Sequence, residues 1–396
     1  MSNSLPYAGI RVIEFTHMVM GPTCGMVLGD LGAEIIKVEP IEGDKTRDLK
    51  GSGAGFFSMF NRNKKSIAVD LKSKEGQELV EKLIASADIV SENFRAGAMS
   101  QLGFDYATLS KKYPRIIYVS HKGFLPGPYE NRTALDEVVQ MMGGLAYMTG
   151  PEGRPLRAGS SVNDIMGGIF GALGAMAALK QRETTGLGQE VQSSLFENNV
   201  FLVGQHMMQY ASTGVPAAPM PSRISAWGIY DVFSVKNDEQ IFLAVVSDGQ
   251  WEKFCNTFNL DNLREDLRFT TNNLRVENRE VLLPILKEFL GSKYLNEIAE
   301  KFESNGLPYA LIKKPQDLFD DPHLIATDGL GEIEMSSGPR SGTTTKTPLL
   351  PITMDGKRLQ IRLNPPKLGE HSKSLLNGLG YSDSEIDQLI INKVVQ

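Results

Sequence analysis

The chain has 396 residues, of which 41% are hydrophobic and 22% charged, with a formal net charge of -6. This length allows two domains with buried cores, and the acidic balance argues against a general nucleic-acid-binding protein. The cysteines, Cys24 and Cys255, match neither a metal-ligand spacing nor a disulfide framework. The N-terminus lacks the basic and apolar regions of a signal peptide. We therefore expect a cytoplasmic protein that binds neither nucleic acid nor a membrane.

Short runs of β-branched residues in the first 123 positions predict a parallel sheet flanked by helices. The predicted strands are residues 9–15, 34–39, 65–70, 87–93 and 115–123. The spacing of apolar residues predicts helices at 75–86 and 106–114. This alternation is typical of an α/β fold.

The chain becomes helical and rich in methionine after residue 135. Helices are predicted within residues 135–150, 160–182 and 194–213, and four methionines in or near them are expected to fill the core: Met141, Met142, Met207 and Met208. A proline-rich linker over 213–228 is followed by a hairpin that turns at Asn237 and Asp238 and then by several helices. We expect a large domain over 1–215, a small domain over 216–330 and a return segment to the large domain over 331–396.

A single acid, Asp164, stands at the start of the apolar, glycine-rich stretch 160–182. Ser161 and Asp164 match the [ST]-x-x-[DE] pattern of a helix cap, and the positive end of the helix dipole is expected to keep Asp164 ionised. Glycines in a helix interior cost up to about 1 kcal/mol each relative to alanine, so we expect this helix to approach another backbone or a ligand closely. The apolar run 165–179 is shorter than the roughly 18 to 20 residues of a membrane span.

Several familiar sites are absent from the sequence. No G-x-G-x-x-G follows the first strand, and neither a P-loop nor a G-x-S-x-G elbow occurs. The histidines form no metal-ligand pair, so we expect no metal. Basic residues do follow several predicted strands, and on one edge of a sheet they would suit phosphate groups: Lys37, Arg47, Lys72, Arg95 and Lys122.

Seven stretches, in order, resemble the class III coenzyme A transferases, the family of formyl-CoA:oxalate and carnitine CoA-transferases. They are "FTHMVMGP", "LGDLGAEIIKVE", "GDKTR", "FNRNKKSIAVDLK", "SENFRAG", "SVNDIMGG" and "PPKLGEH", and they span nearly the whole chain. The resemblance implies a Rossmann-like large domain with a parallel sheet, a smaller α+β domain and an interlocked homodimer. It also implies coenzyme A, carried as an acyl-CoA substrate, and a small carboxylic acid as the second substrate.

The resemblance assigns the catalytic role to Asp164. Its carboxylate would attack the acyl-CoA to form a mixed anhydride, and the released thiolate would then form an aspartyl-CoA thioester. The residues that the resemblance assigns to coenzyme A are His17, Met18, Val19, Leu71, Lys72, Asn93, Phe94 and Arg95. Pro40, Gln101 and Ala134 stand where the oxalate enzymes have basic residues. Further candidates for holding the coenzyme are Arg47, Arg132 and Asp136.

Two positions are candidates for substrate contact. Gly249 lies where the oxalate enzymes have a run of glycines, and Arg223 is kept from an Arg-His-Pro-like segment. The lost glycines make oxalate a poor candidate, and we expect a mono- or dicarboxylate of the succinate kind, with succinyl-CoA as a possible donor. One alternative is an acyl-CoA racemase of the same fold, but the second proton-transfer group of those enzymes, a histidine, is missing near Leu135. The other is a protein that binds CoA thioesters without catalysis.

Overall fold

The computed structural model describes residues 5–223 and 225–396. The chain forms two compact units. The first contains the described residues up to Pro219 together with Pro322–Gln396, and the second is Met220–Asp321. The small domain expected from the sequence was 216–330, and the second unit of the structure is 220–321.

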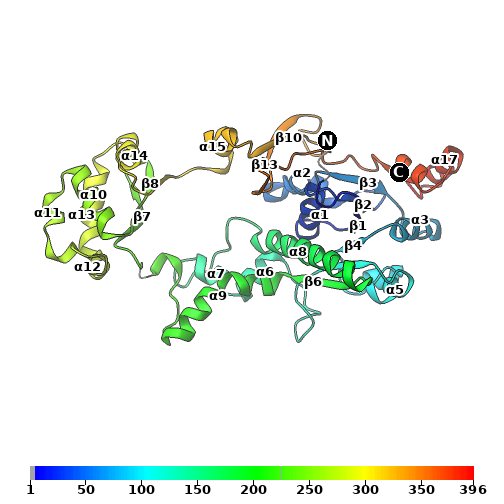
Figure 1. The fold of residues 1–396 in the computed structure, drawn as a ribbon, viewed down its shortest axis with the longest axis horizontal. Coiled ribbons are helices and arrows are strands. Elements are labelled where there is room, and N and C mark those ends of the chain that lie inside the picture. The colour runs from blue at the N-terminus through cyan, green and yellow to red at the C-terminus, as the bar shows by residue number, and fades with distance from the viewer. Residues whose placement is uncertain (1–4, 224) are drawn as a thin grey trace. The chain divides into compact units, whose positions relative to one another are not determined.

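The first unit contains a six-stranded sheet in the order β3-β2-β1-β4-β5-β6, and all neighbours are parallel (Figure 1). The strands are β1 (Arg11–Phe15), β2 (Glu34–Glu39), β3 (Lys64–Ala68), β4 (Ile89–Glu92), β5 (Ile117–Lys122) and β6 (Glu190–Ser194). The five strands predicted from the sequence are confirmed. Strand β6 was missed because its residues, EVQSS, are mostly polar and only Val191 is β-branched.

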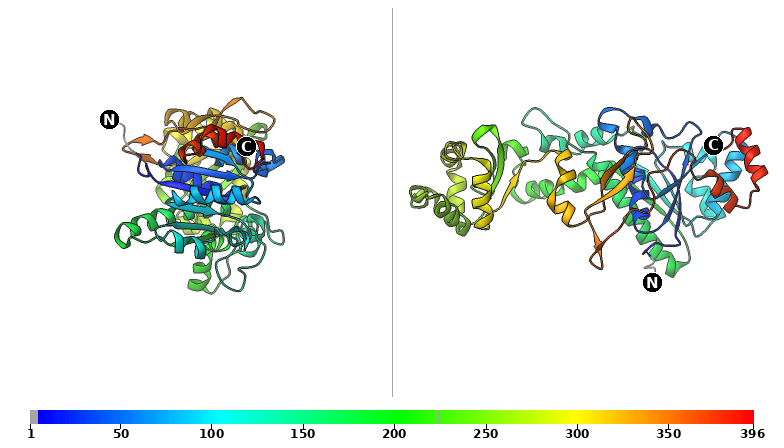
Figure 2. Two further views of the ribbon diagram at one scale, coloured as in Figure 1. Left: turned by 90° about the vertical axis from the view of Figure 1, so that its right-hand side faces the viewer. Right: turned by 90° about the horizontal axis from the view of Figure 1, so that it is seen from above.

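Helices cover both faces of this sheet (Figure 2). The helices of the first unit are α1 (Met20–Asp30), α2 (Phe56–Phe60), α3 (Lys74–Ala85), α4 (Ala98–Leu102), α5 (Tyr106–Lys112), α6 (Asp136–Met142), α7 (Leu145–Thr149), α8 (Val162–Thr185), α9 (Leu195–Thr213), α15 (Pro322–Ala326), α16 (Ser372–Gly378) and α17 (Asp383–Ile391). On one face, Ile13 and Phe15 share a core with residues of α3, α16 and α17. On the other face, Val12 and Ile35 share a core with α1 and α8.

Helix α8 packs very closely against its neighbours. A Cβ atom on Gly168 would collide with the carbonyl oxygen of Met20 and lie 2.5 Å from Cβ of Thr23, both on α1. A Cβ atom on Gly171 would lie 2.5 Å from Cε1 of His121 at the end of β5. The close approach predicted from the glycines is therefore confirmed, and the helix is held between α1 and the sheet.

The argument from length against a membrane span was wrong. Helix α8 has 24 residues, and it is the one helix in the described chain that is long and apolar enough to cross a membrane. A buried core helix passes the same test, and the contacts of Gly168 and Gly171 are of that kind.

The prediction that the methionines fill the core was mostly wrong. Met141 on α6 is 46% exposed, and Met207 and Met208 on α9 are 55% and 64% exposed. Met142 is partly buried against a small cluster that includes Val139. The sequence shows that these helices are apolar, but it cannot show which apolar side the chain leaves uncovered.

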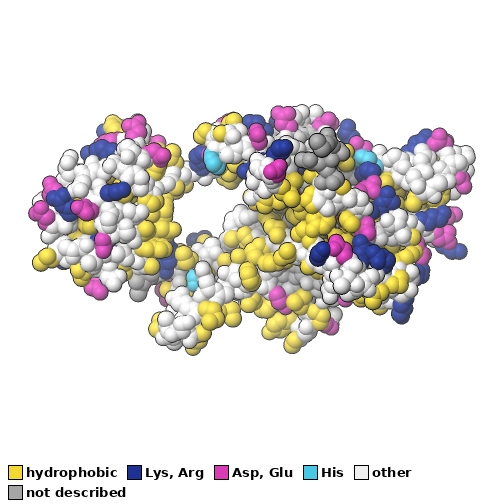
Figure 3. Space-filling view, in the orientation of Figure 1, with side chains coloured by type: hydrophobic (Ala, Val, Ile, Leu, Met, Phe, Trp, Pro, Cys, Tyr) yellow, Lys and Arg dark blue, Asp and Glu magenta, His cyan; other side chains and the backbone are white. Residues whose placement is uncertain are grey.

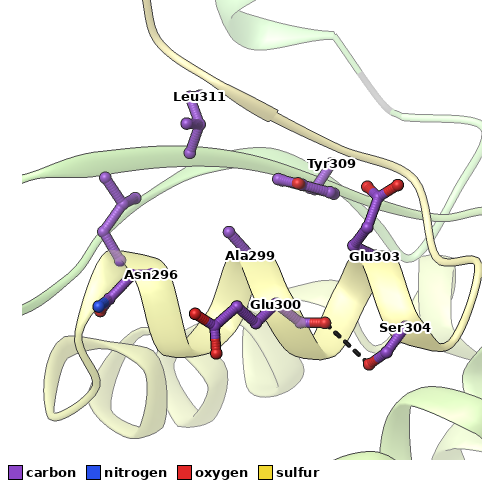
Figure 4. Close-up of a pocket in the computed structure, with 8 residues that line it drawn as sticks. Asn296, Ala299, Glu300, Glu303, Ser304, Tyr309 and Leu311 are labelled. Carbon is purple, nitrogen blue, oxygen red and sulfur yellow. Dashed lines mark hydrogen bonds between the residues drawn. The ribbon is translucent and has the colours of Figure 1, made fainter.

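The second unit has a three-stranded antiparallel sheet in the order β7-β8-β9 with helices packed against it. Its elements are β7 (Ile229–Ser234), β8 (Gln240–Val245), α10 (Asp248–Phe258), α11 (Asp261–Arg264), α12 (Asn272–Glu277), α13 (Arg279–Gly291), α14 (Leu295–Ser304) and β9 (Tyr309–Leu311). The predicted hairpin is confirmed, because Asn237 and Asp238 adopt positive φ angles between β7 and β8. A cavity of about 460 Å³ lies between α14 and β9, where Ala299, Tyr309 and Leu311 point toward one another (Figure 4).

The return segment adds two short antiparallel hairpins to the first unit. They are formed by β10 (Leu330–Glu334) with β11 (Thr344–Pro348) and by β12 (Thr353–Met354) with β13 (Lys357–Arg358). The last residues pair with the end of the sheet, because Val395 bridges Val69 and the backbone N–H of Gln396 donates to the carbonyl of Ala68. The chain thus covers the β3 edge with its own end.

The close approach of α8 and α1 predicts a cost for a single methyl group. Gly168→Ala should lower the free energy of unfolding by about 1 to 3 kcal/mol, because the added carbon meets the Met20 carbonyl and Thr23. Gly378→Ala at the end of α16 is the control: nothing lies within 4 Å of its Cβ position, so alanine should raise stability by up to about 1 kcal/mol. Urea unfolding measures both, and equal effects would contradict the close packing of α8.

Candidate functional site

The candidate site begins where β1 and β4 lie side by side and the chain leaves them in opposite directions across the sheet. Ligands of open parallel sheets bind at such a switch point, beyond the carboxyl ends of the strands. His17 follows β1 and Asn93 follows β4, and the two are tied together. The His17 N–H donates to Oδ1 of Asn93 (3.0 Å), and Nδ2 of Asn93 donates to the His17 carbonyl (2.8 Å). The rings of His17 and Phe94 stack with centroids 6.0 Å apart.

The turn between β1 and α1 has a strained backbone, which hydrogen bonds to Thr46 and Lys37 hold in place. Met18 has φ 63°, an uncommon value for a residue with a side chain. Its N–H donates to Oγ1 of Thr46 at 2.9 Å, and Nζ of the buried Lys37 donates to the Thr16 carbonyl at 2.5 Å. Burial lowers the pKa of His17, so its imidazole is mostly neutral at pH 7. The exposed side chains of His17 and Met18 line the switch point, whereas that of Val19 is buried in the core.

The start of α8 is held by a carboxylate from another helix. Asp136, the first residue of α6, is buried, and its Oδ2 accepts hydrogen bonds from the backbone N–H groups of Asn163 (2.8 Å) and Asp164 (3.1 Å). Its Oδ1 accepts from Nε2 of Gln140 at 2.5 Å, and Oε1 of Gln140 accepts from the N–H of Ala158 at 2.8 Å. Asp136 was a candidate for holding coenzyme A, but here it serves the helix.

The predicted cap at this helix was wrong. The Ser161 side chain makes no capping hydrogen bond, because the donors that it would satisfy already bind Asp136. A pattern of neighbouring residues cannot reveal a competitor that lies on another helix.

The prediction that Asp164 is readily ionised was also wrong. Its pKa is raised to about 7, first by burial and then by the negative charge of Asp136, while Arg157 acts in the opposite direction. The helix dipole favours the carboxylate, but Asp136 already occupies the N–H groups that carry most of that effect. Asp164 is therefore divided between its neutral and charged forms at neutral pH. It stands one turn before Gly168, which contacts Met20 at the start of α1.

The basic residues predicted to follow the strands have different environments. Lys72 and Arg95 are exposed after β3 and β4, and Leu71 and Phe94 are both partly buried against one core. Nζ of Lys122 binds Oε1 of Glu92 at 2.8 Å. Lys72 and Arg95 are thus accessible to the phosphate groups of a nucleotide, and Leu71 and Phe94 offer apolar surface beside them.

Two further cationic candidates are less available. Arg47 is buried and makes a bidentate ion pair with Glu39, with distances of 2.6 and 2.8 Å, and its guanidinium lies 3.8 Å from the ring centroid of Phe57. This arginine supports the fold and has little left to offer a phosphate group. Arg132 is exposed and lies over the ring of Tyr129.

A cavity of about 620 Å³ lies beside the start of α8. Its apolar lining comes from α2 and from Ile165, and its polar lining comes from the segment that leads into α8. The lining includes Phe56, Met59, Phe60, Arg157, Ser160, Ser161 and Ile165. Arg157 was not among the residues predicted for the site, although it lies only seven residues before Asp164.

The two substrate candidates belong to the second unit. Gly249 is in the first turn of α10 and has open space at its Cβ position. Nη1 of Arg223 donates to the Met220 carbonyl at 2.6 Å. Over the ranges 5–223 and 225–396, no three His, Cys, Asp or Glu side chains gather as a metal site would require.

The chain is similar to several known proteins. The family model described as "CoA-transferase family III" matches residues 7–372. A succinate–glutarate CoA-transferase of Agrobacterium fabrum is 33% identical over 94% of this chain and 95% of its own length. An acetyl-CoA:oxalate CoA-transferase of Acetobacter aceti is 34% identical over 84% of this chain and 88% of its own length. The crystal structure of a CAIB/BAIF family protein from Brucella suis has a TM-score of 0.84 at 32% identity, covering 95% of this chain and all of that one.

The raised pKa of Asp164 predicts a pH-dependent cost. The folded-state pKa of about 7 exceeds the ordinary value of 3.8, so the folded protein binds an extra proton between these values and stability falls as pH rises through them. The full loss is about 4 kcal/mol. Asp164→Asn should therefore raise the free energy of unfolding at pH 8 and change it little at pH 4. Urea titrations at one protein concentration measure this difference.

Glu183→Gln is the control for this experiment, because it removes one negative charge from the exposed end of the same helix. Its effect should be small at both pH values. Equal effects of Asp164→Asn at pH 4 and pH 8 would show that Asp164 is not destabilised as a charge.

Proposed function

Because the chain belongs to CoA-transferase family III and is therefore a CoA-transferase, we propose that Asp164 is the nucleophile of the transfer. A single observation carries this proposal: Asp164 is a partly buried carboxyl at the first turn of a glycine-rich helix, with a pKa of about 7. About half of it is ionised at neutral pH, and a more basic carboxylate is a stronger nucleophile toward an acyl carbon.

The transfer proceeds in balanced steps. An Oδ atom of Asp164 attacks the acyl carbon of the acyl-CoA, the C–S bond breaks, and the thiolate leaves with the electron pair. The thiolate then attacks the aspartyl carbonyl and releases the donor acid as its carboxylate, which leaves an aspartyl-CoA thioester. The acceptor carboxylate attacks that thioester and releases the thiolate again. The thiolate finally attacks the acceptor's acyl carbon in the new anhydride, which forms the product and restores Asp164.

The chain's own groups support these steps. The exposed side chains of His17 and Met18 at the switch point, with Phe94 beside them, offer a surface for the coenzyme next to α1. Gly168 packs α8 against the start of α1, and the proposal puts Asp164, one turn earlier on α8, beside that surface. The charge of Asp136 favours the neutral acylated form of Asp164 over the free carboxylate.

We propose a small dicarboxylic acid as acceptor, with succinyl-CoA as a possible donor. The relative that acts on succinate and glutarate and the relative that acts on oxalate are 33% and 34% identical, so overall similarity does not choose between them. The single Gly249 in place of a run of glycines disfavours oxalate. The cavity of about 620 Å³ beside α8 is larger than oxalate requires.

We also propose an interlocked homodimer. Helices α8 and α9 expose large apolar side chains, among them Leu173 at 53%, Phe201 at 72% and Met208 at 64%. Figure 3 shows hydrophobic side chains gathered over this part of the first unit. Apolar patches of this kind mark protein interfaces, and a second copy of the chain would cover them.

Replacement of Asp164 tests the nucleophile. Asp164→Asn should lower transfer from succinyl-CoA to glutarate by more than about 1,000-fold, since the amide cannot form the anhydride. Incubation of the wild-type protein with succinyl-CoA and then hydroxylamine should leave a hydroxamate on Asp164, which peptide mass spectrometry detects. An unmodified Asp164, with the hydroxamate on another carboxyl, would contradict the mechanism.

The same mixtures separate transfer from racemisation. A transferase requires the acceptor acid, whereas a racemase would exchange the α-hydrogen of an acyl-CoA with deuterium oxide when no acid is present. Exchange without any new thioester would refute the proposed transfer.

The proposed dimer predicts an unusual resistance to subunit exchange. Light scattering should give twice the mass of one chain. Tagged and untagged dimers should not exchange subunits on mixing until denaturant unfolds them, because interlocked chains cannot separate while folded. Exchange within minutes in buffer would contradict interlocking, and a monomer mass would contradict the dimer.

A further inference from the structure

The cavity beside α8 is lined by Arg157, a half-buried arginine that makes only long ion pairs. The buried arginines of the described chain each hold a carboxylate at hydrogen-bond distance: Arg47 with Glu39 at 2.6 Å, Arg62 with Asp30 at 2.7 Å, Arg182 with Asp88 at 2.8 Å, and Arg275 with Asp248 at 2.6 Å. Arg157 differs from them. Its guanidinium stays 3.8 Å from Asp136 and 3.6 Å from Glu137, and its Nε donates to the carbonyl of its neighbour Ala158.

The acids near Arg157 do not saturate it. Asp136 already accepts from Asn163, Asp164 and Gln140, and Glu137 is 58% exposed to solvent. Among the described residues, no side chain accepts a hydrogen bond from either Nη atom of Arg157 at an ordinary distance. The guanidinium fork therefore remains able to bind a planar carboxylate through two parallel hydrogen bonds.

The backbone beside Arg157 adds donors for an anion. The N–H groups of Ser160, Ser161 and Val162 precede or begin α8, and none of them has an acceptor within the described chain. Ser160 and Ser161 line the same cavity as Arg157. A negative group at this place would meet a side-chain cation and the free N–H groups of a 24-residue helix.

The floor of the cavity is apolar. Phe56, Met59 and Phe60 of α2 face Ile165 of α8 across it, and these side chains belong to or pack against one core. This surface suits methylene groups and offers nothing to a second charged group. The cavity thus combines one carboxylate-binding end with a surface for a short aliphatic chain.

We propose that Arg157 binds the distal carboxylate of a dicarboxylic acid substrate, whose aliphatic chain lies over Phe56 and Met59 while its other carboxylate reaches Asp164. The inference rests on the proposed function of Asp164 and makes Arg157 a specificity-determining residue. Asp164 and the cavity share the first turn of α8, with Ser161 three residues before Asp164 and Ile165 directly after it. Acylation removes the charge of Asp164, which leaves Arg157 with one acid fewer to balance.

A pair of acids of equal length tests the proposal. Glutarate carries a distal carboxylate, and valerate carries a methyl group in its place. Arg157→Gln should lower kcat/KM for glutarate by roughly 10- to 100-fold and that for valerate by less than about threefold, since a charged hydrogen bond is lost only with the diacid. Arg157→Lys should recover part of the glutarate activity. Arg154→Gln, an exposed arginine of the same loop, should change neither acid.

The outcomes separate the two proposals. An equal loss for glutarate and valerate in a variant with an unchanged thermal midpoint would show that Arg157 acts on the common step, and the inference would fall. A wild-type enzyme that transfers CoA to no acid would refute the proposed function. In that case saturation-transfer NMR of glutarate with wild-type protein and Arg157→Gln still tests the subsite, and equal binding by both would overturn it.

Discussion

The structure of the site depends on one carboxylate that holds the start of a helix. Asp136 accepts the backbone N–H groups of Asn163 and Asp164, and it does so from the buried first turn of α6. Two consequences follow from this contact. It holds the start of α8 in place, one turn before Gly168 packs against α1. It also puts a negative charge beside Asp164. Asp136 thus holds Asp164 in place, and its charge adds to burial, the larger cause of the raised pKa of Asp164.

This arrangement makes Asp164 costly as a charge and useful as a nucleophile. A carboxyl with a pKa of about 7 is partly neutral in the folded protein, so burial and Asp136 together oppose its ionised form. The acylated residue has no charge and escapes this opposition. The protein accepts a loss of stability at neutral pH that the covalent intermediate would relieve, as strained functional sites commonly do.

The sequence could predict local features and not the contacts between distant segments. Strands β1 to β5 were predictable because runs of β-branched residues announce buried parallel strands, while β6, with only Val191, was not. The glycines of α8 predicted a close approach, but the partners Met20 and His121 lie far away in the sequence. The predicted Ser161 cap was wrong for the same reason, because Asp136 on α6 accepts the hydrogen bonds that Ser161 would have accepted.

The candidate site shows the same division between strand ends and side-chain charges. The resemblance assigned both His17 and Asn93 to coenzyme A, and the structure joins them by paired hydrogen bonds where β1 and β4 end. Arg47 was expected among the phosphate-binding cations, yet Glu39 neutralises it in the core. The sequence shows where the basic residues are, but only the folded chain shows which of them form ion pairs with carboxylates.

That distinction separates Arg47 from Arg157. Each arginine lies within 4 Å of at least one carboxylate: Arg47 near Glu39, and Arg157 near Asp136 and Glu137. Arg47 forms a bidentate ion pair with Glu39 at 2.6 and 2.8 Å. The oxygen atoms of Asp136 instead accept hydrogen bonds from backbone and amide N–H groups, and Nη2 of Arg157 stays 3.8 Å from Oδ1 of Asp136. The contact that caps α8 therefore also keeps a guanidinium free at the edge of an apolar cavity. One buried acid thus adds to the effect of burial on the pKa of Asp164, and it leaves the guanidinium of Arg157 without a short hydrogen bond.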